Sequence, residues 1–216
     1  MITLENNPSV VGISTPYGFE TRNALGQICF GGVQTWYRTI WKRKAGCGPT
    51  TASNLFVQLA RSDPHFASLC PYDPATQAGF LSLMEEVWRY ITPTLMGVNT
   101  TDLFVRGAVR YAAERGVTLR PRVLEIPLLA ANRPDKKALG AFMEDAFGEN
   151  LPVAFLNLCN GGVGNLEKWH WVTMVSINRD TLWAEICDQG EKFAIDLALW
   201  LRATTRNGGF VVLGAG

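Results

Sequence analysis

The spacing of apolar residues changes near Gly148, and this change limits what the chain can fold into more than any other feature of the sequence. Before it, apolar side chains recur at helical intervals in residues 48–61, 76–90, 100–115 and 134–148. After it, short apolar runs between turn residues are typical of strands, in residues 153–156, 169–177, 181–186, 192–195 and 210–213. Early helices and late strands predict an α+β fold, with a helical N-terminal half and an antiparallel sheet in the C-terminal half.

The length of the chain fits one domain of ordinary size. A chain of 216 residues with 47% hydrophobic content can bury a sizeable core. We therefore expect a single domain over residues 1–216, with residues 1–148 as a mainly helical lobe and residues 149–216 as a mainly sheet lobe. A strand-like segment at residues 117–126 lies within the helical half. An active site built from an early helix and a late sheet would lie between the two halves.

The charge pattern and the termini exclude several classes of partner. The net charge is +1, without a block of like charges that would indicate binding to nucleic acid. Residues 1–11 lack the basic-then-apolar order of a signal peptide. The richest apolar run, residues 169–177, is shorter than the about 20 residues that cross a bilayer. We expect a soluble, cytoplasmic protein with no membrane partner.

The five cysteines are widely spaced, at Cys29, Cys47, Cys70, Cys159 and Cys187. An odd number without any Cys-x-x-Cys pair argues against both a disulfide framework and a zinc site. We therefore expect reduced thiols and no bound metal. One of these thiols stands out by its neighbours.

Cys47 lies between Gly46 and Gly48 and just before Pro49, at the expected start of a helix. The glycines would let the backbone turn sharply and leave the sulfur open, and Pro49 suits the first helical turn, where no amide donor is needed. Either Thr50 or Thr51 is expected near the helix cap. The positive helix end and a nearby imidazolium both favour the thiolate, so Cys47 is the candidate nucleophile. The basic run 42–44 just before it is expected to be a solvated loop.

A thiol nucleophile needs a base, and the chain has two histidines. His65 falls in a loop that follows Pro64, where a histidine is usually structural or exposed to solvent. His170 falls in an otherwise apolar strand, where a polar ring needs a partner or a purpose. His170 is therefore the candidate base. The alternative is a half-buried histidine that donates to a backbone carbonyl.

Asp188 is the candidate partner of His170. The two residues are 188 − 170 = 18 positions apart, on segments that would form adjacent antiparallel strands joined by a turn at residues 178–180. A carboxylate there could accept the imidazole N–H and fix the tautomer of the ring. The alternative is an ordinary turn aspartate before Gly190.

The segments around these residues resemble segments of the papain-like cysteine peptidases, in particular of the bacteriocin-leader (double-glycine) peptidases and their bacterial relatives. The segment Cys47-Gly48-Pro49-Thr50 resembles the opening of that family's nucleophile helix. His170-Trp171-Val172 resembles its histidine strand, and Asp188-Gln189-Gly190 resembles the neighbourhood of its Asp-x-x-Gly motif, with one residue fewer before the glycine. The resemblance implies a two-lobed papain-like fold, a thiolate–imidazolium pair and a thioester intermediate, with no cofactor.

The sequence departs from that family in one place, because residues 40–46 contain no glutamine that could donate to the oxyanion. Gln34, at 47 − 34 = 13 positions before Cys47, is the nearest candidate, with the Cys47 backbone N–H as the second donor. An insertion at residues 38–44 could loop out between the two. The alternative is that Gln34 is a surface loop residue.

The expected function is a cysteine peptidase or amidase whose partner is a peptide or protein substrate. A transglutaminase-like acyltransferase would use the same three residues, and a non-catalytic peptide-binding protein could use the same scaffold. The substrate and the oligomeric state stay open.

Overall fold

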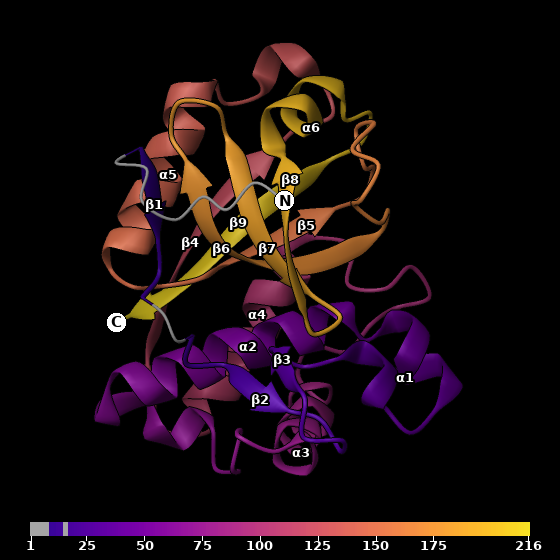
Figure 1. Cartoon of the computed structure of the whole chain (residues 1–216), viewed down its shortest axis with the longest axis vertical. Helices are drawn as coiled ribbons and strands as arrows, with labels where there is room; N and C mark the ends of the chain where they lie inside the picture. Colours follow the sequence, from indigo (N-terminus) through magenta and orange to yellow (C-terminus); the bar gives the residue numbers. More distant parts are fainter. Residues whose placement is uncertain (1–8, 15–16) are drawn as a thin grey trace.

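A computed structural model describes residues 9–14 and 17–216, which form a helical part and a sheet part (Figure 1). The helical part contains α1 (Ile40–Ala45), α2 (Cys47–Ser62), α3 (Gln77–Val87) and α4 (Thr101–Ala113). Short 3₁₀ helices, η1 (Gln34–Trp36), η2 (Pro64–Leu69) and η3 (Ala130–Asn132), connect longer elements. Helices α2 and α4 contact the sheet, so they form the boundary between the two parts.

The sheet part is built around seven strands, all of whose pairings are antiparallel. The strand order is β4-β9-β5-β6-β7-β8, and β1 pairs with β6 as well. The bounds are β1 (Val10–Gly12), β4 (Leu119–Ile126), β5 (Val153–Asn157), β6 (His170–Asn178), β7 (Trp183–Asp188), β8 (Glu191–Asp196) and β9 (Gly208–Ala215). Two helices of this part, α5 (Lys136–Gly148) and α6 (Leu197–Ala203), contact the sheet. The mixed helix and antiparallel sheet confirm the expected α+β class.

Side-chain caps explain where several helices begin. Thr76, Thr100 and Asp135 each accept a hydrogen bond from the backbone N–H three residues later, at the starts of α3, α4 and α5. Such a cap typically contributes about 1 kcal/mol to helix stability. Gly116, just beyond α4, has φ +72°, the left-handed conformation expected where that helix stops.

Helix α2 is more deeply buried than its apolar stripe predicts. Every residue from Cys47 to Leu59 is buried, because α3, α4, η2 and β6 surround the helix. The expected threonine cap is wrong. Gly46 is the N-cap residue and accepts from the Thr50 N–H, so Thr50 and Thr51 lie inside the helix.

The sheet part begins earlier in the chain than residue 149. Strand β4 pairs with β9 over its whole length, from Leu119 opposite Ala215 to Ile126 opposite Gly208. The N-terminal segment contributes β1 and also β2 (Glu20–Arg22), which pairs with β3 (Ile28–Phe30). Strand β1 forms through its distant partner β6, whereas β2 and β3 pair with each other. Segments of three residues carry little periodicity of their own.

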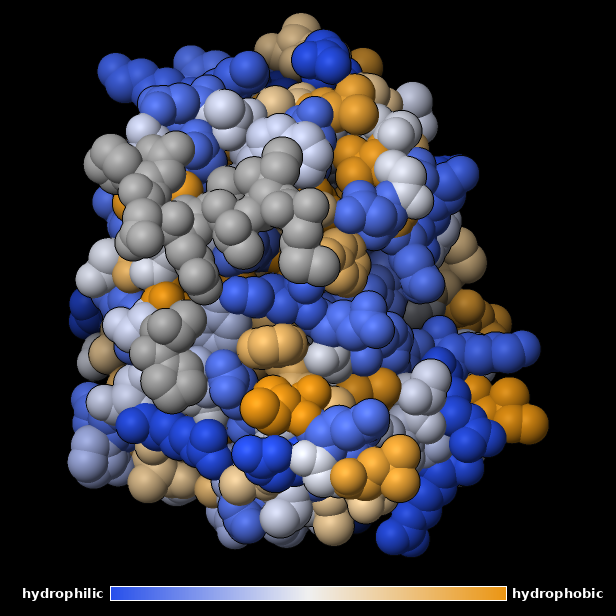
Figure 2. Space-filling model, viewed as in Figure 1, coloured by the Kyte–Doolittle hydropathy of each residue, from blue (hydrophilic) through white to orange (hydrophobic). Residues whose placement is uncertain are grey.

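The buried apolar side chains form one continuous cluster that includes residues of both parts. On the face shown in Figure 2, apolar residues reach the surface in small groups separated by hydrophilic side chains. None of the helices in the described residues combines the length and the apolar character needed to cross a membrane.

Candidate active site

Cys47 is the first residue of α2, and its thiol lies at the junction of the helical and sheet parts. The side chain is 8% exposed. The neighbouring glycines are needed for space and not for an unusual backbone conformation, since Gly46 has an ordinary φ of −85°. A Cβ atom on Gly46 would lie 2.4 Å from the Tyr37 ring, and one on Gly48 would lie 2.9 Å from Val98. Close packing at both glycines therefore fixes the position of the thiol.

His170 is the first residue of β6, and 4% of it is exposed. Its neighbour Trp171 is buried, stacks on Phe104 of α4 at 4.4 Å between ring centroids, and donates its indole N–H to the Val98 carbonyl at 2.6 Å. The anchored Trp171 side chain fixes the start of the strand, and His170 lines the same small cavity as Cys47.

Asp188, the last residue of β7, lies beside His170 as the sequence predicts. Its Oδ1 atom is 2.8 Å from the imidazole Nε2 atom. The register pairs Thr173 with Cys187, which brings the end of β7 next to the start of β6. Asp188 therefore holds the ring through Nε2, and the other ring nitrogen, Nδ1, is left for Cys47.

The electrostatics of this group favour a charged imidazole. Burial of the ring acts to lower the pKa of His170, but the hydrogen bond to Asp188 and the interactions with the Cys47 side chain outweigh it and raise that pKa to about 10. An imidazolium that stays protonated above neutral pH can stabilise a neighbouring thiolate. The pair can thus hold a nucleophile and a proton donor at the same time.

Gln34 lies at the start of η1 and lines the same small cavity as Cys47 and His170. It is buried, so the alternative of a surface loop residue is wrong. Its Nε2 atom donates to the Arg43 carbonyl at 2.7 Å, and one N–H of the amide remains. Residues 40–45 form α1 instead of the expected solvated loop, and this helix fills the interval between Gln34 and Cys47.

Asn54, a buried polar residue of α2, also supports this arrangement. It is buried, accepts from the Gly32 N–H at 2.9 Å and donates to the Thr173 hydroxyl at 2.9 Å. Asn54 therefore joins the nucleophile helix to the segment before Gln34 and to the histidine strand. A buried polar side chain among the apolar residues of a helix is the signal that could have identified it.

The turn between β7 and β8 connects Asp188 to the same segment. Gln189 and Gly190 have φ +49° and +82°, values typical of a tight hairpin turn. The Gly190 carbonyl accepts from the Phe30 N–H at 2.8 Å, and a Cβ atom on Gly190 would lie 2.8 Å from Val33. A glycine is required there both for its conformation and for this close approach.

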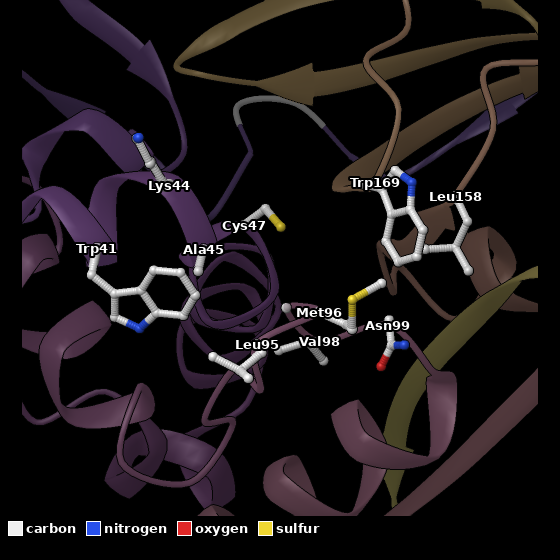
Figure 3. A pocket seen from close by; sticks show the side chains of 11 residues that line it. Trp41, Lys44, Ala45, Cys47, Leu95, Met96, Val98, Asn99, Leu158 and Trp169 are labelled. Carbon is white, nitrogen blue, oxygen red and sulfur yellow. The ribbon is translucent and has the colours of Figure 1, made fainter.

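The thiol also lines an open groove with a volume of about 280 Å³. Figure 3 shows Trp41 on one side of Cys47, Trp169 and Leu158 on the other, and Leu95, Met96 and Val98 below. These residues come from α1, from the turn at residues 94–97 and Val98 after it, and from the two ends of the loop between β5 and β6. No local pattern in the sequence indicates this groove.

The other titratable candidates lie outside this arrangement. His65 is exposed on η2 and lines neither the groove nor the small cavity. All five cysteines are free thiols. Among the described residues, no group of three His, Cys, Asp or Glu side chains is placed to hold a metal ion.

Comparisons with known proteins add no assignment. The chain matches no protein-family model, and no curated protein matches its sequence.

Proposed function

We propose that the protein is a thiol-dependent hydrolase, a cysteine peptidase or amidase that acts through Cys47, His170 and Asp188. The observation that carries the proposal is the arrangement of a thiol at a helix start, an imidazole held by a carboxylate at 2.8 Å, and a groove that opens on the thiol. A nucleophile, a base and an orienting group in this relation are what acyl transfer requires.

A papain-like fold is part of the proposal. It is supported by the order of the three residues along the chain, by a nucleophile helix in the helical part, and by His170 and Asp188 on adjacent antiparallel strands. The resemblance of Cys47-Gly48-Pro49 to the opening of the nucleophile helix of that family agrees with this placement.

In the first step, the Cys47 thiolate attacks the carbonyl carbon of the scissile bond, and the carbonyl oxygen becomes an oxyanion. The Cys47 backbone N–H has no intrahelical acceptor, because it belongs to the first turn of α2. This N–H and the remaining amide N–H of Gln34 are the donors proposed to stabilise the oxyanion. The His170 imidazolium then protonates the departing amine, the C–N bond breaks, and a thioester to Cys47 remains.

In the second step, neutral His170 takes a proton from water, and the resulting hydroxide attacks the thioester carbon. Collapse of the second oxyanion breaks the C–S bond, releases the carboxylic acid product and restores the thiolate–imidazolium pair. An amine in place of water would give acyl transfer, which is the alternative activity for the same residues. Asp188 keeps the imidazole in one orientation through both steps.

Selective alkylation tests whether Cys47 is activated. Iodoacetamide at about pH 6.5 should modify Cys47 before the other four cysteines, as measured by mass spectrometry of the digested protein. Cys159 should react second, because a hydrogen bond with the Thr205 hydroxyl lowers the pKa of its thiol to about 7. Cys29, Cys70 and Cys187 should react slowly, because burial raises the pKa of each thiol.

The variant His170→Asn provides the control for this experiment. It should slow the alkylation of Cys47 and leave that of Cys159 unchanged, since only Cys47 interacts with the imidazole. A Cys47 that reacts no faster than the buried cysteines would contradict the proposed hydrolase and would favour a non-catalytic peptide-binding protein.

Replacement of Gln34 tests the proposed oxyanion donor. Gln34→Ala should lower kcat by about 100-fold and leave the alkylation rate of Cys47 nearly unchanged, because an oxyanion donor acts on the transition state and not on the thiolate. Gln58→Ala is the matched control: Gln58 is also a buried glutamine, but it lies within α2 and accepts from the Gly18 N–H at 2.7 Å. The Gln58 variant should lower the melting temperature without this loss in kcat. If Gln34→Ala has the same kcat as Gln58→Ala, then Gln34 does not stabilise the oxyanion.

A further inference from the structure

The groove beside Cys47 exposes large apolar side chains that the proposed reaction does not use. Leu95 is 94% exposed and Met96 56% exposed, while Trp41 and Trp169 each expose more than a third of their surface. Apolar surface of this kind is unfavourable in water, and contiguous patches of it mark binding sites. All four residues line the same groove (Figure 3).

The walls of this groove are held in place by the surrounding structure. Thr94 and Gly97 exchange two backbone hydrogen bonds, of 3.1 and 3.0 Å, and thereby close the tight turn that presents Leu95 and Met96. The Val98 carbonyl that follows is bound by the Trp171 indole. A preformed groove loses less conformational entropy on binding than one that must first become ordered.

Trp169 reaches the groove through an unusual backbone conformation. Its φ is +57°, in the left-handed region that bulky residues rarely adopt. The Arg206 guanidinium lies 5.5 Å from the centroid of the Trp169 ring. Backbone strain that places a side chain next to a reactive residue is typical of functional sites.

The charge at the groove has one sign. Lys44 is the only charged residue among those described that line it. Lys44 is exposed and makes no ion pair within the described part of the chain, whereas Lys42 on the same helix pairs with Glu85. An ammonium group without a carboxylate partner, at the edge of an apolar groove, is complementary to a ligand that has a carboxylate next to an apolar group.

We propose that the groove binds a peptide segment in which a bulky apolar side chain neighbours an acidic one. The apolar side chain lies between Trp41 and Trp169, and the carboxylate pairs with Lys44. The volume of about 280 Å³ suits one or two residues of an extended chain, since sites for drug-sized ligands start near about 300 Å³. This inference rests on the proposed function, because it names the substrate class of the same site.

Protection of Cys47 from alkylation tests the inference. Blocked tetrapeptides that contain Phe-Glu, Phe-Lys or Asn-Glu are added to the protein, and the rate of iodoacetamide labelling at Cys47 is followed by mass spectrometry. The Phe-Glu peptide should protect at a concentration about tenfold lower than either of the other two. Phe-Lys loses the attraction to Lys44 and gains a repulsion, and Asn-Glu loses the burial of the apolar side chain. Any cleavage of the peptides is recorded in the same spectra.

Charge reversal at Lys44 tests whether this residue causes the preference for the acidic peptide. In Lys44→Glu, the Phe-Lys peptide should protect better than the Phe-Glu peptide, whereas Lys136→Glu, an exposed lysine on α5, should keep the original order. Fast labelling of Cys47 with no dependence on peptide charge, or with the same dependence in Lys44→Glu, would overturn this inference alone. Slow labelling of Cys47 without any peptide would instead overturn the proposed function, and the inference with it.

Discussion

Cys47→Ala and His170→Ala should each lower kcat/KM by about 10⁴- to 10⁶-fold, because a nucleophile and its base act as one unit. For the same reason, the double variant should be no slower than either single variant. The measurement is steady-state hydrolysis of an activated acyl donor, the p-nitrophenyl ester of an N-blocked phenylalanine. Wild-type protein should also release a burst of p-nitrophenol as the thioester forms.

His65→Ala is the matched control for this result, since His65 is the other histidine of the chain and is exposed on η2. It should retain the full rate. The base would be assigned to the wrong residue if His170→Ala kept a tenth of the wild-type activity. The same would follow if His65→Ala lost as much activity as His170→Ala.

Asp188→Asn and Asp188→Ala should move the alkaline limb of the pH profile of kcat/KM to lower pH. Acylation needs the imidazolium, so activity is lost as the pH rises through the pKa of His170, which is raised to about 10. Removal of the carboxylate removes the hydrogen bond that supports this raised pKa, and the limb should shift by about 1 to 3 pH units. Asp188→Asn can still accept the N–H, so it should retain more of the peak rate than Asp188→Ala.

Asp180→Ala is the control for the pH experiment, because Asp180 is an exposed aspartate in the turn between β6 and β7. Its profile should match that of the wild-type protein. Near-UV circular dichroism establishes that the Asp188 variants keep the native packing. If they do and their alkaline limb stays in place, then Asp188 does not determine the charge of His170.

The three residues of the proposed reaction could be found in the sequence because each has a local signal. Cys47 lies between glycines at a helix start, His170 is a polar ring in an apolar strand, and Asp188 follows from the geometry of a hairpin. The side chains that cap α4 and α5, Thr100 and Asp135, likewise lie directly before the helices that they cap. The signals at Cys47 and His170 depend only on residues within a few positions, and the signal at Asp188 depends on a single hairpin.

The rest of the site depends on contacts between distant segments, and these have no local signal. The groove brings Trp41, Leu95 and Trp169 together from three separate parts of the chain. Likewise, β1 forms because Val10 pairs with Asn178. The wrong threonine cap at α2 has a different cause: tertiary packing around Gly46 fixes the helix start without any capping side chain. Tertiary packing overrides local preference in such places.

The hydrogen bond between Asn54 and Thr173 joins two segments that the ribosome adds at widely separated times. Asn54 and Thr173 are 119 positions apart, and Cys47 precedes His170 by 170 − 47 = 123 positions. A ribosome therefore completes the thiol long before it adds the base, and at about 5–20 residues per second this interval lasts at least several seconds. On the proposed function, the nascent chain carries an ordinary thiol throughout that time. A chain that ends before residue 170 then has no hydrolytic activity, because the activity requires the histidine strand to pack against the nucleophile helix.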